Sequence, residues 1–159
     1  FDFMPHVGAT TFEGIRMDVA AAVEHLRADD AERRLFTVGF CFGGSNSWYQ
    51  AAAGHGLSGA IGFYGNPDRR DVPLGAPSVV SLVDEMECPV LALMGGDDPG
   101  IPTEMVDRYR RELDEAGVEN SVVIYPNAPH SFFDRSYAVH AAESADAWQR
   151  VQAFLAANS

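Results

Sequence analysis

A short apolar run that ends in a cysteine between glycines constrains this chain most: residues 35–48 read LFTVGFCFGGSNSW. The run at 35–40 is β-branched and aromatic, which predicts a strand. The small residues of SNSWYQAAA predict a helix that ends near Gly54 and Gly56. A strand that passes into a helix through G-x-C-x-G has the pattern of a nucleophile elbow, with cysteine where serine is usual. Such a turn requires an α/β sheet with the reactive side chain at the carboxyl end of a strand.

The run at 35–40 and three further apolar runs show no polar alternation, which predicts strands covered on both faces. The further strands are expected at 58–65, 88–96 and 121–126, and helices at 14–27, 103–116 and 138–156. In the last helix, Trp148, Val151 and Leu155 are predicted to share the apolar face. The proline-rich segment 66–78 is predicted to be a loop. Together these elements indicate an α/β fold, a mostly parallel open sheet flanked by helices, in a single domain over 1–159.

The negative net charge of the chain argues against two classes of binding partner, nucleic acids and membranes. The 159 residues include 11 basic and 23 acidic side chains, for a formal net charge of −12, and 47% of them are hydrophobic. This much negative charge repels phosphate backbones and anionic lipid surfaces, so neither nucleic acid nor membrane is an expected partner. No apolar stretch approaches the roughly 20 residues that a membrane span needs, and we find no signal peptide.

The cysteines are predicted to be free thiols, and the location cytoplasmic. Without a secretory signal, a reducing compartment is expected for Cys41 and Cys88. Because Cys88 precedes a strand, it is interpreted as a packing residue. Histidines 6, 25, 55 and 140 follow no metal-ligand spacing, so no metal site is predicted. The first residue is Phe1 and not methionine, which suggests the remainder of a longer chain.

Reactive side chains follow three of the predicted strands. In an open parallel sheet, ligands bind beyond the carboxyl ends of the strands. Cys41 follows the first strand, Asp97 and Asp98 follow the third in LMGGDDPGIP, and His130 follows the last in YPNAPHSFFDR. Nucleophile, acid, histidine is the chain order of an α/β-hydrolase triad. His130 would accept the thiol proton, an aspartate would orient the imidazole, and the backbone N–H of Phe42 would stabilise an oxyanion.

The elbow has a steric rationale as well as a chemical one. The tight turn is expected to hold Cys41 in a strained conformation. Gly39 and Gly43 are predicted to lie too close to neighbouring backbone to carry a β-carbon. At the amino end of the following helix, the dipole favours a thiolate over a thiol. Each signal alone has an ordinary explanation: a packing cysteine, an Asp-Asp-Pro-Gly turn and a loop histidine.

The segments GFCFGG, MGGDDPGIP and APHSFFDR resemble the three signature segments of the dienelactone hydrolase, or carboxymethylenebutenolidase, family. The resemblance extends from about residue 14 to the end. It implies an α/β-hydrolase fold and a triad of Cys41, Asp98 and His130. Asp98 is preferred to Asp97 because it stands four residues before Pro102. The implied activity is hydrolysis of a lactone or small ester through a thioester, without metal or organic cofactor.

The resemblance also implies a binding pocket and a longer chain. Family members bind an anionic substrate through arginine; Arg135 follows the histidine, one position later than in the family pattern. Tyr64, Ser131 and Phe132 are expected pocket walls. The family has further amino-terminal strands, whose loops supply a second oxyanion N–H and a glutamate next to the resting cysteine. We therefore expect this chain to be the carboxyl-terminal two-thirds of a protein that is monomeric at full length, whereas a chain lacking those strands would tend to self-associate.

Two other functions stay open at the level of sequence. A domain without half of its oxyanion hole could be a catalytically impaired binding or scaffold domain. A cysteine elbow in an α/β sheet also occurs in amidotransferase glutaminases, which place the acid just after the histidine. Asp134 would take that role here.

Overall fold

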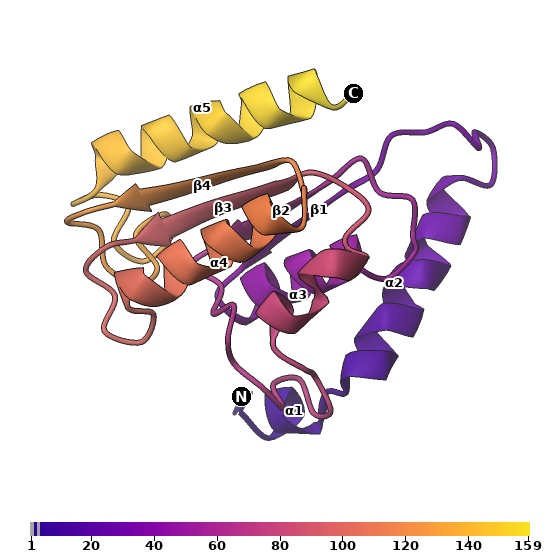
Figure 1. Cartoon of the computed structure of the whole chain (residues 1–159), viewed down its shortest axis with the longest axis horizontal. Coiled ribbons are helices and arrows are strands. Elements are labelled where there is room, and N and C mark those ends of the chain that lie inside the picture. Colours follow the sequence, from indigo (N-terminus) through magenta and orange to yellow (C-terminus); the bar gives the residue numbers. More distant parts are fainter. Residues whose placement is uncertain (1, 3) are drawn as a thin grey trace.

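The structure is a computed structural model that describes residue 2 and residues 4–159 (Figure 1). One sheet contains four parallel strands in the order β1 (Phe36–Phe40), β2 (Gly59–Phe63), β3 (Val90–Gly95) and β4 (Asn120–Tyr125). The α-helices are α1 (Met4–Ala9), α2 (Phe12–Leu26), α3 (Phe42–Ala51), α4 (Thr103–Glu115) and α5 (Ala141–Ala157), and a 3-10 helix, η1, spans Val79–Glu85. The predicted α/β architecture is confirmed. The short elements α1 and η1 were not predicted.

The helices form a layer on each face of the sheet. In Figure 1, α5 lies on one face, and α3 and α4 lie on the other. Between these layers β2 and β3 are buried along their whole length, as their apolar sequences predict. Trp48 of α3 packs directly on β2, where the absence of a side chain at Gly62 makes room for its ring. The indole N–H donates a hydrogen bond of 3.2 Å to the carbonyl of Leu91, which fixes α3 over the centre of the sheet.

Strand β1 is not covered on both of its faces, contrary to the prediction. Alternation along the strand turns Phe36, Val38 and Phe40 to the α5 side of the sheet. The carboxyl-terminal part of α5 reaches only the start of β1, where the rings of Phe36 and Phe154 lie 6.3 Å apart. Val38 therefore keeps 58% of its surface exposed and Phe40 keeps 40%. The prediction holds for the inner strands β2 and β3 and is wrong for β1. Strand β4 follows it only in part, because Tyr125 is its one buried residue.

The predicted apolar face of α5 is also partly wrong. Val151 is buried, but Trp148 is 51% exposed. The residues that α5 buries are Ser144, Ala147 and Val151, spaced by three and four along the helix. Two of these side chains are small, which lets the helix lie close to the sheet.

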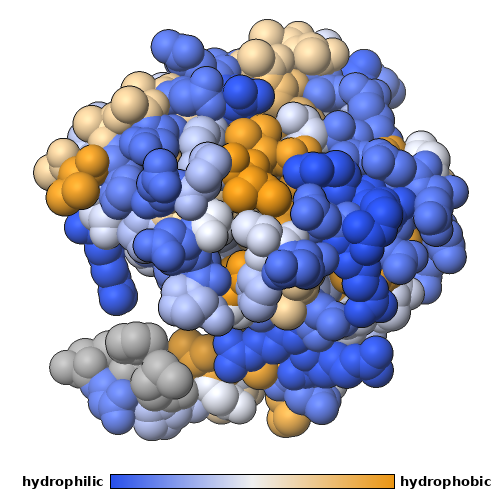
Figure 2. Space-filling view, turned by 60° about the vertical axis from the view of Figure 1, so that its left-hand side comes forward, coloured by the Kyte–Doolittle hydropathy of each residue, from blue (hydrophilic) through white to orange (hydrophobic). Residues whose placement is uncertain are grey.

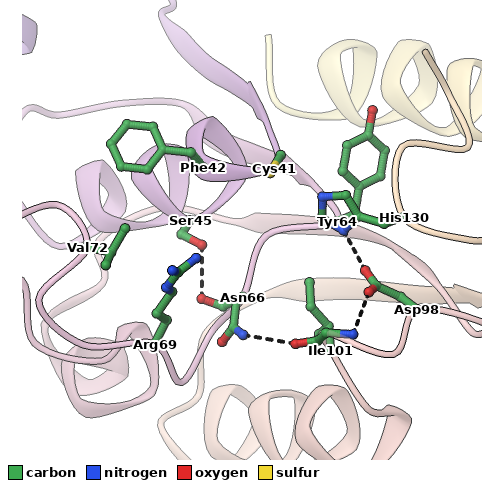
Figure 3. Close-up of a pocket in the computed structure, with 11 residues that line it drawn as sticks. Cys41, Phe42, Ser45, Tyr64, Asn66, Arg69, Val72, Asp98, Ile101 and His130 are labelled. Atoms are coloured by element: carbon green, nitrogen blue, oxygen red, sulfur yellow. Dashed lines mark hydrogen bonds and ion pairs between the residues drawn. The ribbon is translucent and has the colours of Figure 1, made fainter. Parts of the chain in front are cut away.

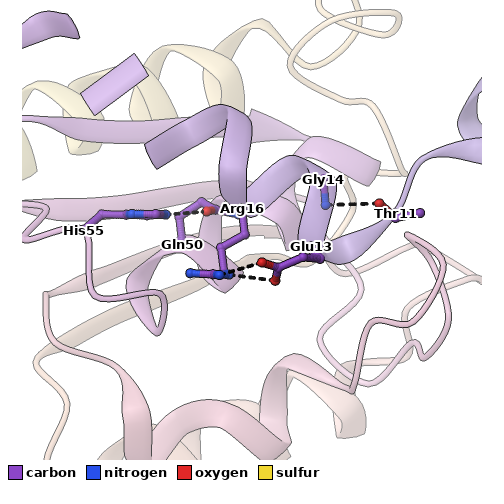
Figure 4. Close-up of polar contacts among 6 residues, drawn as sticks. All are labelled: Thr11, Glu13, Gly14, Arg16, Gln50 and His55. Carbon is purple, nitrogen blue, oxygen red and sulfur yellow. Dashed lines mark hydrogen bonds and ion pairs between the residues drawn. The ribbon is translucent and has the colours of Figure 1, made fainter. Parts of the chain in front are cut away.

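Helix α2 lies at the side of the molecule and buries none of its residues completely. It begins two residues before the predicted start because Thr11 caps it, accepting a 3.0 Å hydrogen bond from the Gly14 N–H (Figure 4). Glu13 and Arg16 form a surface ion pair in the first turns. No helix in the described part of the chain combines the length and apolarity that crossing a membrane demands.

Candidate active site

Cys41 is the single residue between β1 and α3. Its backbone has φ 53° and ψ −115°, a conformation that a residue with a β-carbon rarely adopts, as the elbow pattern predicts. The Cys41 N–H donates to the carbonyl of Phe63 (3.0 Å), and the Cys41 carbonyl accepts from the Gly44 N–H (2.9 Å). These bonds hold the turn against the end of β2 and the first turn of α3. The thiol is exposed at the carboxyl end of the sheet.

Two glycines make this turn sterically possible, and one of them is not the predicted one. A β-carbon on Gly39 would lie 1.8 Å from the carbonyl oxygen of Gly43, so the prediction for Gly39 is confirmed. A β-carbon on Gly43 would meet open space, so the prediction for Gly43 is wrong. The second close approach belongs to Gly44, whose β-carbon would lie 2.6 Å from the carbonyl oxygen of Phe63. The first turn of α3 faces β2 through residue 44 and not through residue 43.

His130 lies on the same side of the sheet and is hydrogen-bonded to Asp98. Its Nδ1 is 2.6 Å from Oδ2 of Asp98, whose side chain is 4% exposed, whereas the imidazole is 36% exposed. The other carboxylate oxygen of Asp98 accepts from the Gly100 N–H at 2.9 Å. This pairing fixes the Nδ1–H tautomer and leaves Nε2 free to accept a proton. In Figure 3, Nε2 faces the Cys41 side of the cavity.

The other sequence candidates for the acid lie elsewhere. Asp97 is exposed, and its N–H donates to the carbonyl of Ala128. Asp134 is exposed in the turns that follow His130, and its charge acts on the hydroxyl of Tyr64. Neither carboxylate contacts the imidazole.

A cavity of about 280 Å³ joins these groups. Its lining comes from the carboxyl ends of the strands and the loops that follow them: Cys41, Phe42, Ser45, Tyr64, Asn66, Arg69, Val72, Asp98, Gly100, Ile101 and His130 (Figure 3). Figure 2 brings this side of the molecule forward and shows an apolar patch within a mostly hydrophilic surface. Cys41 makes no hydrogen bond to His130 among the described contacts, and such bonds often form only when substrate is bound.

Tyr64, a predicted pocket wall, and Phe42, the predicted oxyanion donor, both line the cavity. The Phe42 N–H starts α3 and donates no hydrogen bond within the described part of the chain, which leaves it available at the cavity wall. The ring of Tyr64 lies 5.0 Å from the ring of His130. The hydroxyl of Tyr64 is buried without a well-aligned partner, and burial, reinforced by the charge of Asp134, raises its pKa well above the usual range. Tyr64 therefore supplies a neutral wall.

Three predicted binding residues do not line the cavity. Phe132 is fully buried in the core beneath α5, where its ring lies 5.1 Å from that of Tyr125 and 5.7 Å from that of Tyr64. Ser131 has a φ of 62° and closes a turn with its carbonyl. Arg135 is exposed, and its N–H bonds to the carboxylate of Asp134. The successive turns after His130 direct one side chain into the core and the next ones outward.

Sequence reasoning missed the opposite wall of the cavity, which comes from the loop after β2 and from Ser45. Ser45 donates a 2.9 Å hydrogen bond to the carbonyl of Asn66, and Asn66 donates through Nδ2 to the carbonyl of Gly100. Arg69 and Val72 continue this wall. The rule that placed Cys41, Asp98 and His130 would have found it, because Asn66 and Arg69 also follow the carboxyl end of a strand.

The described residues contain no group of three or more histidines, cysteines, aspartates and glutamates able to hold a metal ion. The polar cluster of Figure 4 lies on α2 and α3, away from the cavity lining. In it, Nε2 of His55 lies 3.0 Å from Oε1 of Gln50, and burial lowers the pKa of that imidazole. The Gln50–His55 contact joins α3 to the turn after it.

Comparison with known proteins places these features in context. The Dienelactone hydrolase family model matches residues 1–159. A protein of Escherichia coli (strain K12) named "Putative carboxymethylenebutenolidase" is 37% identical over 120 residues, which are 74% of this chain and 44% of that protein. One of the same name from Salmonella typhimurium is 35% identical over 142 residues, 88% and 52% of the two chains. The chain spans about half the length of these curated relatives.

Solved structures share the fold of this chain. The "Putative Dienelactone Hydrolase" from Klebsiella pneumoniae superposes with a TM-score of 0.82 at 30% identity, covering 92% of this chain and 62% of that one. An acylaminoacyl peptidase, at 16% identity and a TM-score of 0.70, shares the fold. These neighbours have the α/β-hydrolase fold.

Proposed function

The chain belongs to the dienelactone hydrolase family, and from this premise we propose that it is a cysteine-dependent hydrolase that cleaves lactone or small ester bonds. The observation that carries the proposal is the 2.6 Å hydrogen bond between His130 and Asp98 at a cavity that Cys41 also lines. A buried carboxylate that orients an imidazole beside an exposed, strained cysteine has the parts that nucleophilic catalysis needs.

The first half of the reaction forms a thioester. The Cys41 thiol gives its proton to Nε2 of His130 while Sγ attacks the carbonyl carbon of the substrate. The Phe42 N–H then donates to the oxyanion. When the intermediate collapses, the bond from the carbonyl carbon to the ester oxygen breaks, and His130 returns the proton to the leaving oxygen. Asp98 stays ionised throughout and stabilises the transient imidazolium.

The second half releases the acid. A water molecule attacks the thioester carbon and gives a proton to Nε2 of His130. The carbon–sulfur bond breaks, and the proton returns to Cys41. One water is consumed, and an ester yields an acid and an alcohol, whereas a lactone yields one open-chain product. No step requires a metal or an organic cofactor.

The glutaminase alternative is less well supported. It needs an acid directly after the histidine, and Asp134 makes no contact with His130, whereas Asp98 does. The second alternative is a binding or scaffold domain without catalysis. The activity test described next distinguishes it from a hydrolase.

The test compares the two cysteines as alanine variants. The purified protein is incubated with 4-nitrophenyl acetate and with a dienelactone, and Cys41→Ala is expected to lower the turnover by at least about 10³-fold. Cys88→Ala is the matched control and should keep most of the activity. Mass spectrometry after rapid quenching should detect the acylated protein only where Cys41 is present. Full turnover in Cys41→Ala would refute the nucleophile, and no turnover in the unmodified protein would favour the scaffold alternative.

A further inference from the structure

Stacked aromatic rings join the strand that carries Cys41 to the loop that carries His130. Phe40 ends β1 and directly precedes Cys41, and Phe133 lies three residues after His130. Their rings are stacked, with centroids 5.9 Å apart and an interplanar angle of 19°. Phe63 of β2 contacts both rings, at 4.7 Å and 4.6 Å. Among the described residues no hydrogen bond joins segment 36–41 to segment 130–137.

The other contacts of the imidazole start from other strands. The hydrogen bond to Asp98 ties His130 to the loop after β3. The ring of Tyr64 contacts the imidazole from the end of β2, and its contact with β1 is again the ring of Phe40, at 6.3 Å. Phe40 is therefore the point at which β1 meets the surroundings of the histidine.

The distance between these two segments matters for proton transfer. Nε2 of His130 has to come within hydrogen-bond distance of the Cys41 thiol, and a displacement of about 1 Å can cost about 10²-fold in rate. Asp98 orients the imidazole from the β3 side, which leaves its distance from β1 to be set by other contacts. The stacked rings lie one and three residues from the two reacting side chains, so they are placed to set that distance.

Both rings can be changed with little damage to the core. Phe40 is 40% exposed and Phe133 is half-buried, whereas the neighbouring Phe132 is fully buried. A stacked aromatic pair is worth about 0.5–1.5 kcal/mol beyond the area that it buries. The described lining of the cavity includes neither Phe40 nor Phe133, so an effect of either ring on the rate has to act through the reacting side chains.

We propose that Phe40 and Phe133 are positioning residues, whose stacked rings hold Nε2 of His130 within reach of the Cys41 thiol. The rings touch neither the substrate nor the reacting atoms. Both halves of the proposed hydrolysis pass a proton through Nε2, so a longer distance slows each of them. This inference rests on the proposed function.

The experiment changes the ring of Phe133 and measures kcat and KM with 4-nitrophenyl acetate. Phe133→Leu is expected to lower kcat by about 10-fold with less than about a twofold change in KM. Phe133→Tyr keeps a ring that can stack and should keep kcat within about twofold. Phe36→Leu is the matched control, because it removes a half-buried ring from the same face of β1 at the end away from Cys41, and it should leave kcat unchanged.

A second variant tests whether the two rings act together. Phe40→Leu should lower kcat as much as Phe133→Leu, and the double variant should lose no more than about twofold beyond either. Losses that multiply would refute the shared contact. If circular dichroism shows that Phe133→Leu does not fold, Phe40→Leu is judged by the same change in kcat. Unchanged kcat in a folded variant, or an equal loss in Phe36→Leu, would overturn the proposal.

A measurement without an ester separates this inference from the proposed function. If the unmodified protein hydrolyses no ester, the proposed function fails, and the rate at which iodoacetamide alkylates Cys41 at pH 7, followed by mass spectrometry, decides. His130→Ala gives the rate without the imidazole. Alkylation about 10-fold slower in Phe133→Leu, approaching that of His130→Ala, supports the positioning role. A rate within about twofold of the unmodified protein refutes it.

Discussion

The two cysteines of this chain occupy opposite ends of the same parallel sheet and differ in almost every physical respect. Cys41 follows β1 at its carboxyl end, where the thiol is exposed and the backbone has a positive φ. Cys88 lies two residues before β3, is buried, and has a thiol pKa raised to about 11 by burial, with the charge of Glu87 adding to it. Position relative to the strand direction, and not residue type, separates a candidate nucleophile from a packing residue.

The surroundings of the two thiols extend this contrast. At the carboxyl end, the Phe42 N–H at the start of α3 makes no hydrogen bond within the described part of the chain, and His130 and Arg69 lie on the cavity walls. At the amino end, the Glu87 N–H donates to the carbonyl of Ala51, and the Val90 N–H donates to that of Glu119. The surface depression there is lined by residues 86–89 and 116–119, which include no histidine or arginine. A backbone N–H group is therefore free to bind a ligand at the carboxyl end, whereas these N–H groups at the amino end are used in backbone hydrogen bonds.

The largest expected effect tests the acid at the carboxyl end. Asp98→Asn should lower kcat by about 10³–10⁴-fold, because an amide that faces Nδ1 favours the wrong tautomer of His130. Asp97→Asn is the control, since that side chain is exposed and changes charge equally. Steady-state hydrolysis of 4-nitrophenyl acetate measures both. If kcat fell sharply in Asp134→Asn and stayed unchanged in Asp98→Asn, Asp134 would be the catalytic acid, which would favour the glutaminase hypothesis.

The next effect concerns the steric basis of the elbow. Gly39→Ala should lower the free energy of unfolding by at least about 3 kcal/mol, because its β-carbon would overlap the carbonyl oxygen of Gly43 and only a backbone shift relieves this. Gly43→Ala, four residues away in open space, should change it by less than about 1 kcal/mol. Urea unfolding followed by circular dichroism measures both variants. Similar losses would mean that the turn does not depend on this close approach.

These two regions also show what sequence patterns can predict. The apolar runs predicted all four strands, although only β2 and β3 are buried along their whole length. The rule that ligands bind beyond the carboxyl ends of parallel strands pointed to Cys41, Asp98 and His130, and all three line one cavity. Both arguments use only local periodicity and the direction of parallel strands.

The failures all depend on contacts between distant segments. The loop after β2 follows a strand end, but which of its side chains face the cavity depends on contacts such as the hydrogen bond from the hydroxyl of Tyr49 to the carbonyl of Arg69, 20 residues later. Gly44, and not Gly43, is the crowded glycine because β2 passes beside it. Trp148 stays exposed because small side chains on the neighbouring face bring α5 to the sheet. No periodicity within a segment encodes such contacts.

The smallest expected effect tests the amino end, through the pH dependence of stability. In the unfolded chain the Cys88 thiol titrates near its ordinary pKa of about 8.5, whereas in the folded protein it titrates near 11. As the pH rises, the unfolded chain therefore loses this proton first, so the stability that the neutral thiol contributes is complete below about pH 8 and is lost on the way to pH 11.

At pH 10 this thiol should lower the free energy of unfolding by about 2 kcal/mol relative to pH 7. Denaturant unfolding at the two pH values measures the difference, and Cys88→Ala should show a smaller loss than the unmodified protein. Buried tyrosines also weaken the fold in alkali, but they do so equally in both proteins and cancel in the comparison. Cys41→Ala should retain the full loss because Cys88 is intact. If the loss vanished in Cys41→Ala and persisted in Cys88→Ala, the thiol sensitive to burial would be at the carboxyl end, and the contrast between the two ends of the sheet would be reversed.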